Sequence, residues 1–199
     1  MTYDMRIVGE GEPYAEGAVQ QALANLTAAS RSDFRARTDR ERRAAARAKV
    51  HARIELIKAD PNEFELNASG MTTAKVVMSR LGMLDHDTKH DLWPNQADYG
   101  VTPAMAQLGP EDDEPRELAY FRAAEDAVRD KQAENPTGIP LYKLGTNDNW
   151  LVTRDEITAA LGAYRTALGD GASDCELWWW PYWIEFIERA AKHGGFRVH

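Results

Sequence analysis

The stretch Trp178-Trp179-Trp180-Pro181-Tyr182-Trp183 holds four of the chain's six tryptophans and leads into an apolar helical pattern. Aromatic side chains bury about 150–250 Å² each, so either the core or a partner must cover them. On a helix, Trp180, Trp183 and Ile187 lie on one face, whereas Phe186 lies on another. A helix with two apolar faces is packed on both sides. We therefore expect this helix to organise the fold.

Length and composition are those of an ordinary globular protein. The chain has 199 residues, of which 43% are hydrophobic and 28% charged, so we expect a single domain over residues 1–199. The one cysteine, Cys175, excludes an internal disulfide and is typical of a reducing compartment. The first 30 residues lack a signal-peptide pattern, and no apolar run approaches about 18 residues. The sequence thus predicts a cytoplasmic protein that does not associate with membranes, and it implies no cofactor.

Charge is distributed unevenly along the chain. The formal net charge is −8, but residues 31–49 contain eight basic and three acidic residues. This segment therefore carries +5 and the remainder of the chain −13. An acidic body disfavours general nucleic-acid binding, whereas the basic segment leaves contact with phosphates or with an acidic partner open. We take Arg35, Arg42 and Arg43 as its candidate interface residues.

Helical spacing of apolar residues predicts two helices in the first third of the chain, over residues 14–29 and about 39–58. The two fit an antiparallel hairpin, but the break at residues 30–33 is weak, so one long helix fits as well. Residues 31–58 either dock on the body or protrude as an arm. Further helices are expected over residues 70–81, 114–131, 154–168 and 181–193.

Strands are expected near both ends of the chain and in its middle. Alternating apolar and polar residues predict a strand over residues 3–8, and shorter strands are expected at 64–67 and 196–198. Turn-forming residues at 145–148 predict a β-hairpin over 139–152. Thr153 and Glu156 form a capping-box pattern that starts the next helix.

These elements predict an α+β fold that is predominantly helical. Its small antiparallel sheet would consist of the terminal strands and the 139–152 hairpin, with helices packed on it. Residues 84–113 contain several Pro, Gly and Asp residues without clear periodicity, so they are expected to form a long loop.

The predicted turn gathers polar groups that suit a small polar ligand. Lys143, Asn147 and Asp148 supply charge and amide groups there, and Trp150 follows directly. Asn and Asp also hydrogen-bond their own backbone in turns, which is the alternative interpretation. No nucleophile elbow or phosphate-binding glycine signature occurs, so no catalytic residue is predicted.

His86 and His90 lie four residues apart with carboxylates beside them, a spacing that suits a metal ion on a helix. The preceding helix is expected to end at Gly82, so a solvated acidic loop is favoured and no metal site is predicted.

The aromatic stretch has two interpretations. Its side chains either fill the core or anchor a partner protein through Trp178, Trp179 and Tyr182. The leading hypothesis is a non-enzymatic protein-interaction module that uses this segment, the basic segment, or both. One alternative is an enzyme or small polar-ligand binder that uses the 143–150 turn. The other is nucleic-acid contact through the basic segment. The oligomeric state is not predicted.

Four stretches resemble an uncharacterised family of small proteins from actinobacteria and their phages. They are residues 3–8, Leu66-Asn67 with Gly70-Met71, residues 138–143 with 147–148 and 150–153, and residues 193–196 with Val198. Together they cover about a fifth of the chain. The resemblance implies a shared fold but no established activity, and the link to phages favours a small accessory or host-directed role.

The chain departs from that family's pattern in three places. Tyr142 stands where His is common, Asn149 where Gly is common, and Ala68-Ser69 where an Ile-Trp pair is common. Any mechanism that depends on the missing imidazole or indole ring would not operate in this chain.

Overall fold

The protein is described from a computed structural model, which covers residues 2–9, 11–108 and 114–199. The fold is α+β and mainly helical, as predicted. Its helices are α1 (Glu16–Arg35), α2 (Asp39–Ala59), α3 (Ala68–Arg80), α4 (Arg116–Asp130), α5 (Arg154–Gly169) and α6 (Trp180–Lys192). Its strands are β1 (Thr2–Ile7), β2 (Glu63–Asn67), β3 (Leu84–Asp85), β4 (Ile139–Pro140), β5 (Trp150–Thr153) and β6 (Gly195–Val198). Short 3-10 helices are η1 (Gln96–Tyr99), η2 (Met105–Gln107) and η3 (Leu141–Leu144).

The main sheet is antiparallel and has the strand order β2-β1-β6-β5. Strand β6 lies between β1 and β5, with Val198 opposite both Met5 and Trp150. In β1, Tyr3, Met5 and Ile7 are buried because alternate side chains point to the same face. The two terminal strands therefore form the centre of the sheet, which confirms their predicted place in it.

The predicted β-hairpin over residues 139–152 does not form. Instead, β4 pairs in parallel with β3, with Leu84 opposite Ile139, while β5 pairs with β6. Between β4 and β5 the chain makes the η3 turn, in which the adjacent residues Lys143 and Leu144 are both buried. A strand would place such neighbours on opposite faces, and Pro140 has no N–H for a ladder. The turn residues alone therefore gave the wrong pairing.

The C-terminal aromatic residues form the centre of the core. Trp180, Trp183 and Phe186 on α6 are at most 1% exposed. The ring of Trp183 lies 5.5 Å from that of Phe64 on β2 and 5.8 Å from that of Phe196 on β6. Helix α6 thus packs directly on the sheet, as expected for a helix with two apolar faces.

A glycine allows the chain to enter the sheet directly after α6. Gly195 begins β6 with φ +123°, and a Cβ atom there would lie 2.1 Å from the backbone oxygen of Val152. Any other residue would push β6 away from β5.

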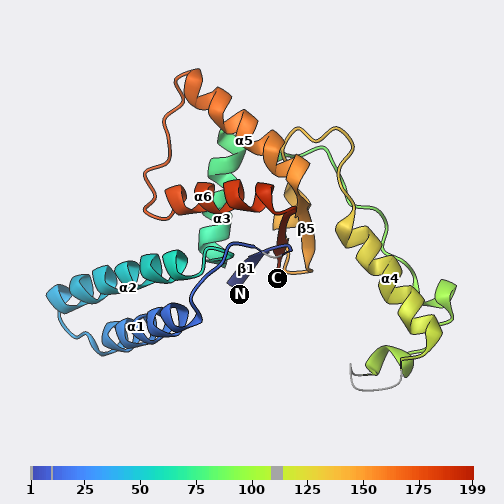
Figure 1. Cartoon of the computed structure of the whole chain (residues 1–199), viewed down its shortest axis with the longest axis horizontal. Coiled ribbons are helices and arrows are strands. Elements are labelled where there is room, and N and C mark those ends of the chain that lie inside the picture. Colours follow the sequence, from blue (N-terminus) through green and yellow to red (C-terminus); the bar gives the residue numbers. More distant parts are fainter. Residues whose placement is uncertain (1, 10, 109–113) are drawn as a thin grey trace.

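Helices α1 and α2 form an antiparallel hairpin that extends to one side of the body, as Figure 1 shows. The contact between them consists largely of small side chains, since the buried residues are Ala22, Ala29, Ala45 and Ala52. A capping box at Thr38 and Glu41 starts α2 after a short turn. Of the two arrangements predicted for this segment, the hairpin is therefore the one that forms, and we call it the arm.

Helix α4 extends from the opposite side of the body (Figure 1). Together with η1 and η2 it encloses a small second cluster around Val101, Leu118 and Phe121. The segment predicted as a long loop, residues 84–113, thus contains β3 and two 3-10 helices, and its last five residues lie outside the described part of the chain.

Candidate functional site

The Lys143 side chain is completely buried and already has its partners. Its Nζ donates to both carboxylate oxygens of Glu156, at 2.8 and 3.0 Å, and to the backbone oxygens of Lys131 and Leu151. Burial lowers the pKa of this ammonium group, and the Glu156 carboxylate opposes that shift. Because its donors are satisfied inside the protein, Lys143 joins η3 to α5, β5 and the end of α4. It does not face a ligand at the surface.

The rest of the predicted ligand turn is bonded to the body or to itself. The Asn147 amide donates to the backbone oxygen of Thr2, and the Thr146 hydroxyl donates to Asp148 at 2.6 Å. Trp150 is 3% exposed, and its Nε1 donates to the Thr146 hydroxyl. These contacts fix the turn to β1 and link its side chains to one another. They differ from the alternative interpretation, in which Asn and Asp bond the backbone of their own turn.

His86 and His90, the histidines with metal-like spacing, have separate surroundings. The His86 Nε2 lies 3.0 Å from the Ser79 hydroxyl. The His90 ring packs beside Tyr142 and Trp150, with ring centroids 5.5 and 5.7 Å apart. The two imidazoles therefore do not converge on one point.

An aromatic cluster joins the loop after β3 to the turn before β5. It comprises His90, Trp93, Tyr142 and Trp150, and the Arg129 guanidinium lies 5.2 Å from the Trp93 ring centroid. Burial is the main reason why the pKa of Tyr142 is raised to about 12. Sequence reasoning missed this cluster because its members come from separate segments and follow no common period.

The C-terminal aromatic candidates divide into buried and exposed residues. Trp179 is 8% exposed and Tyr182 is half-buried, whereas Trp178 is 39% exposed. Trp178 lies beside a hollow that Arg53 and Phe64 also line. Only the first indole of the run thus offers a large contact surface.

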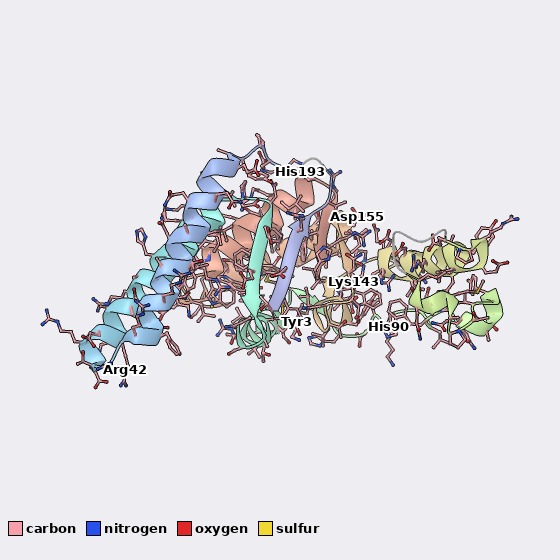
Figure 2. The ribbon with its side chains drawn as sticks, turned by 90° about the horizontal axis from the view of Figure 1, so that it is seen from below. Tyr3, Arg42, His90, Lys143, Asp155 and His193 are labelled. Atoms are coloured by element: carbon pink, nitrogen blue, oxygen red, sulfur yellow. The ribbon has the colours of Figure 1, made fainter. Side chains whose placement is uncertain are left out.

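The basic candidates lie at the far end of the arm, where Figure 2 labels Arg42. The Arg42 guanidinium pairs with Asp39 at 3.5 Å and donates to the backbone oxygen of Arg37. Arg35 and Arg43 are exposed, and within the described residues neither has a carboxylate within ion-pair distance. Phe34, at the end of α1, is 95% exposed.

One face of α2 carries a stripe that the sequence analysis did not resolve. Helical spacing places Arg40, Arg43 and Arg47 on the face opposite the alanines that contact α1, and Val50 and Ile54 continue this line toward the body. We call these five residues the outer stripe. Shallow hollows run along it, one beside the three arginines and one beside Val50 and Ile54. Their i, i+3, i+7 spacing was the signal that could have revealed it.

Comparison with known proteins gave no relatives. No protein-family model, no curated protein and no solved structure matches the chain. The resemblance to actinobacterial and phage proteins therefore stays a prediction. Among the described helices, none is both long enough and apolar enough to cross a membrane.

Proposed function

We propose that the protein is a non-enzymatic interaction module whose arm binds an acidic, amphipathic helix of a partner protein. The observation that carries this proposal is the outer stripe, which combines exposed arginines near the tip with aliphatic residues near the body. The contact would be a helix lying along α2, with its acidic end at the tip.

Charge supports the arm as the contact element. Residues 31–49 carry +5, whereas the rest of the chain carries −13, and the arm holds its basic end away from the acidic body (Figure 2). An acidic partner is therefore attracted to the tip and repelled elsewhere. The arginines of the outer stripe are exposed, and in the described part of the chain they have no ion-pair partner.

The aliphatic half of the stripe favours a protein over a nucleic acid. Val50 and Ile54 are half-buried and border a hollow whose lining is mostly apolar. A phosphate backbone gains nothing from such a surface, whereas the apolar face of a helix does. The neighbouring Ala46 and His51 are exposed and line the same hollow.

The proposal is tested by fluorescence anisotropy with a labelled amphipathic Leu/Glu peptide that is long enough to form a stable helix. The full-length protein is expected to bind this probe. The triple variant R40E/R43E/R47E should weaken binding about tenfold or more, because it replaces attraction by repulsion. V50S/I54S should weaken it as well, because the apolar contact is lost.

A matched control reverses three exposed charges elsewhere, K89E/R116E/K192E, which changes the net charge equally. This control should bind the probe like the wild type. Equal loss in both triple variants would contradict the proposal, because net charge alone would then explain binding. Tighter binding of a single-stranded oligonucleotide, steeply weakened by salt, would favour the nucleic-acid alternative instead.

A further inference from the structure

Strand β2 is the terminal strand of the sheet, and among the described residues it pairs only with β1, so its other edge is free of strand pairing there. The direction of its backbone groups follows from β1. Asp4 exchanges both its hydrogen bonds with His199 on the β6 side, while Ile7 donates to the Asn62 oxygen on the β2 side. Backbone groups alternate along a strand, so the residues opposite Tyr3 and Met5 bond β1. The N–H and C=O groups of Glu63 and Glu65 therefore point to the free edge.

Two hollows lie along this edge, between β2 and the elements beside it. One, of about 170 Å³, is lined by Arg53 and Ile57 of α2, by Leu66 and by Trp178 and Trp179. The other, of about 120 Å³, is lined by Leu23, Leu56, Asp60 and Glu63. They meet where the Arg53 guanidinium bonds the Glu65 carboxylate at 2.7 Å. Side chains of an added strand would find space on both sides of that contact.

The edge carries an excess of negative charge. Asp4, Asp60, Glu63 and Glu65 lie on or beside it, against the guanidinium groups of Arg6 and Arg53. Burial is the main reason why the pKa of Glu63 is raised, and neighbouring carboxylates add to that shift. A cationic group placed here would relieve this repulsion.

We propose that the free edge of β2 binds an extended, basic segment of a partner protein by strand addition. Its backbone would pair with Glu63 and Glu65, and its Lys or Arg side chains would face their carboxylates. Apolar side chains at the alternate positions would point toward the hollow beside Leu66 and Trp178. The exposed indole of Trp178 provides an anchor at the end of the strand.

The charges also argue against a second copy of this chain as the occupant. Pairing β2 with β2 would place Glu63 and Glu65 opposite identical carboxylates, which destabilises a sheet. Strand β2 has no proline within it, and its acidic residues disfavour pairing with a strand of the same charge. These carboxylates do not repel a basic strand, so the edge should be selective for basic strands.

The test uses a fluorescein-labelled peptide of alternating Lys and Val residues with blocked ends as the probe. The full-length protein should bind it, and a Glu/Val peptide should not bind. A second probe carries N-methyl groups on alternate residues, so that the edge facing β2 cannot donate hydrogen bonds. Two such peptides are made, with the methyl groups on the odd or on the even residues. For one of the two, binding should fall about tenfold or more, since strand addition depends on these hydrogen bonds.

Two protein variants separate the backbone from the charge. Glu65→Thr removes the carboxylate but keeps the N–H, whereas Glu65→Pro also removes the N–H at the free edge and leaves the pairing with β1 intact. We expect weaker binding for Glu65→Thr and none for Glu65→Pro, with near-ultraviolet circular dichroism confirming that both variants fold. The R40E/R43E/R47E variant should bind this cationic probe at least as tightly as the wild type does.

Three results would overturn the proposal. The first is equal affinity for the plain probe and for both N-methylated probes, which would make the contact purely electrostatic. The second is equal binding by Glu65→Thr and Glu65→Pro. The third is a dimer of the protein in sedimentation that dissociates in the Glu65→Pro variant, because a second copy would then occupy the edge.

Discussion

Lys143 and Glu156 form a fully buried ion pair that holds several elements together. Besides the Lys143 ammonium, the Glu156 carboxylate accepts the backbone N–H groups of Ala133 and Thr153, so one side chain links the end of α4 to the start of α5. Buried charges are stable only when each has a partner. The pair is therefore structural, and removing one partner should lower the stability of the folded protein.

Replacing Lys143 by Met should destabilise the protein by about 3–5 kcal/mol, because it leaves the Glu156 carboxylate buried without a counter-charge. The K143M/E156Q double variant should be more stable than K143M, since the remaining side chain is neutral. Urea unfolding of the wild type, K143M and K143M/E156Q measures both differences. A double variant that is no more stable than K143M would contradict this account of the pair.

Tyr142 provides a prediction about high pH. Its pKa is raised to about 12 in the folded protein, against about 10 in an unfolded chain. The folded state therefore keeps this proton longer, so the contribution of Tyr142 to stability is complete below pH 10 and is lost as the pH rises to about 12. The tyrosinate absorbance of the wild type minus that of Tyr142→Phe should show a midpoint near pH 12. A midpoint near pH 10 would contradict the burial of this ring.

At the scale of elements, the arm differs from the body in what stabilises it. The contact between α1 and α2 buries mainly alanines, which contribute little hydrophobic free energy. Helix propensity and the cap at Thr38 must therefore supply much of the arm's stability. In contrast, α5 has the same type of cap at Thr153 but packs against the core through Ile157 and Leu161.

Thr38→Ala should cost about 1 kcal/mol, and only locally. Amide hydrogen exchange should accelerate in the first turns of α2, while the midpoint of global unfolding stays unchanged. Thr153→Ala is the matched control, and it should lower the global midpoint because α5 unfolds with the core. If Thr38→Ala lowered that midpoint equally, the arm would belong to the same cooperative unit as the body.

The elements that the sequence predicted correctly are those with local signals. The capping box at Thr153, the apolar spacing of α6 and the alternation in β1 each act within a few residues. The 139–152 hairpin was wrong because the pairing of β4 depends on β3, more than 50 residues earlier in the chain. Lys143 was predicted to supply charge to a ligand at the turn, because its burial depends on a partner that only the fold brings near, namely Glu156.

The whole molecule separates its charges in space. A basic arm extends from one side of an acidic body (Figure 1). Its outer stripe lies on the face of α2 opposite the alanines that contact α1. The free edge of β2 lies near the base of the same arm and carries the opposite charge. The molecule thus presents two surfaces that we propose select partners of opposite sign, and the one at β2 borders the aromatic core through Phe64 and Trp179.

Hydrogen exchange with and without the acidic Leu/Glu helix tests the central claim most directly, because it maps the contact on the full-length protein. The account predicts slower exchange over residues 40–54 of α2 when the probe is bound, and no change in α4. Protection of α4 or of the α6 segment without protection of residues 40–54 would contradict it.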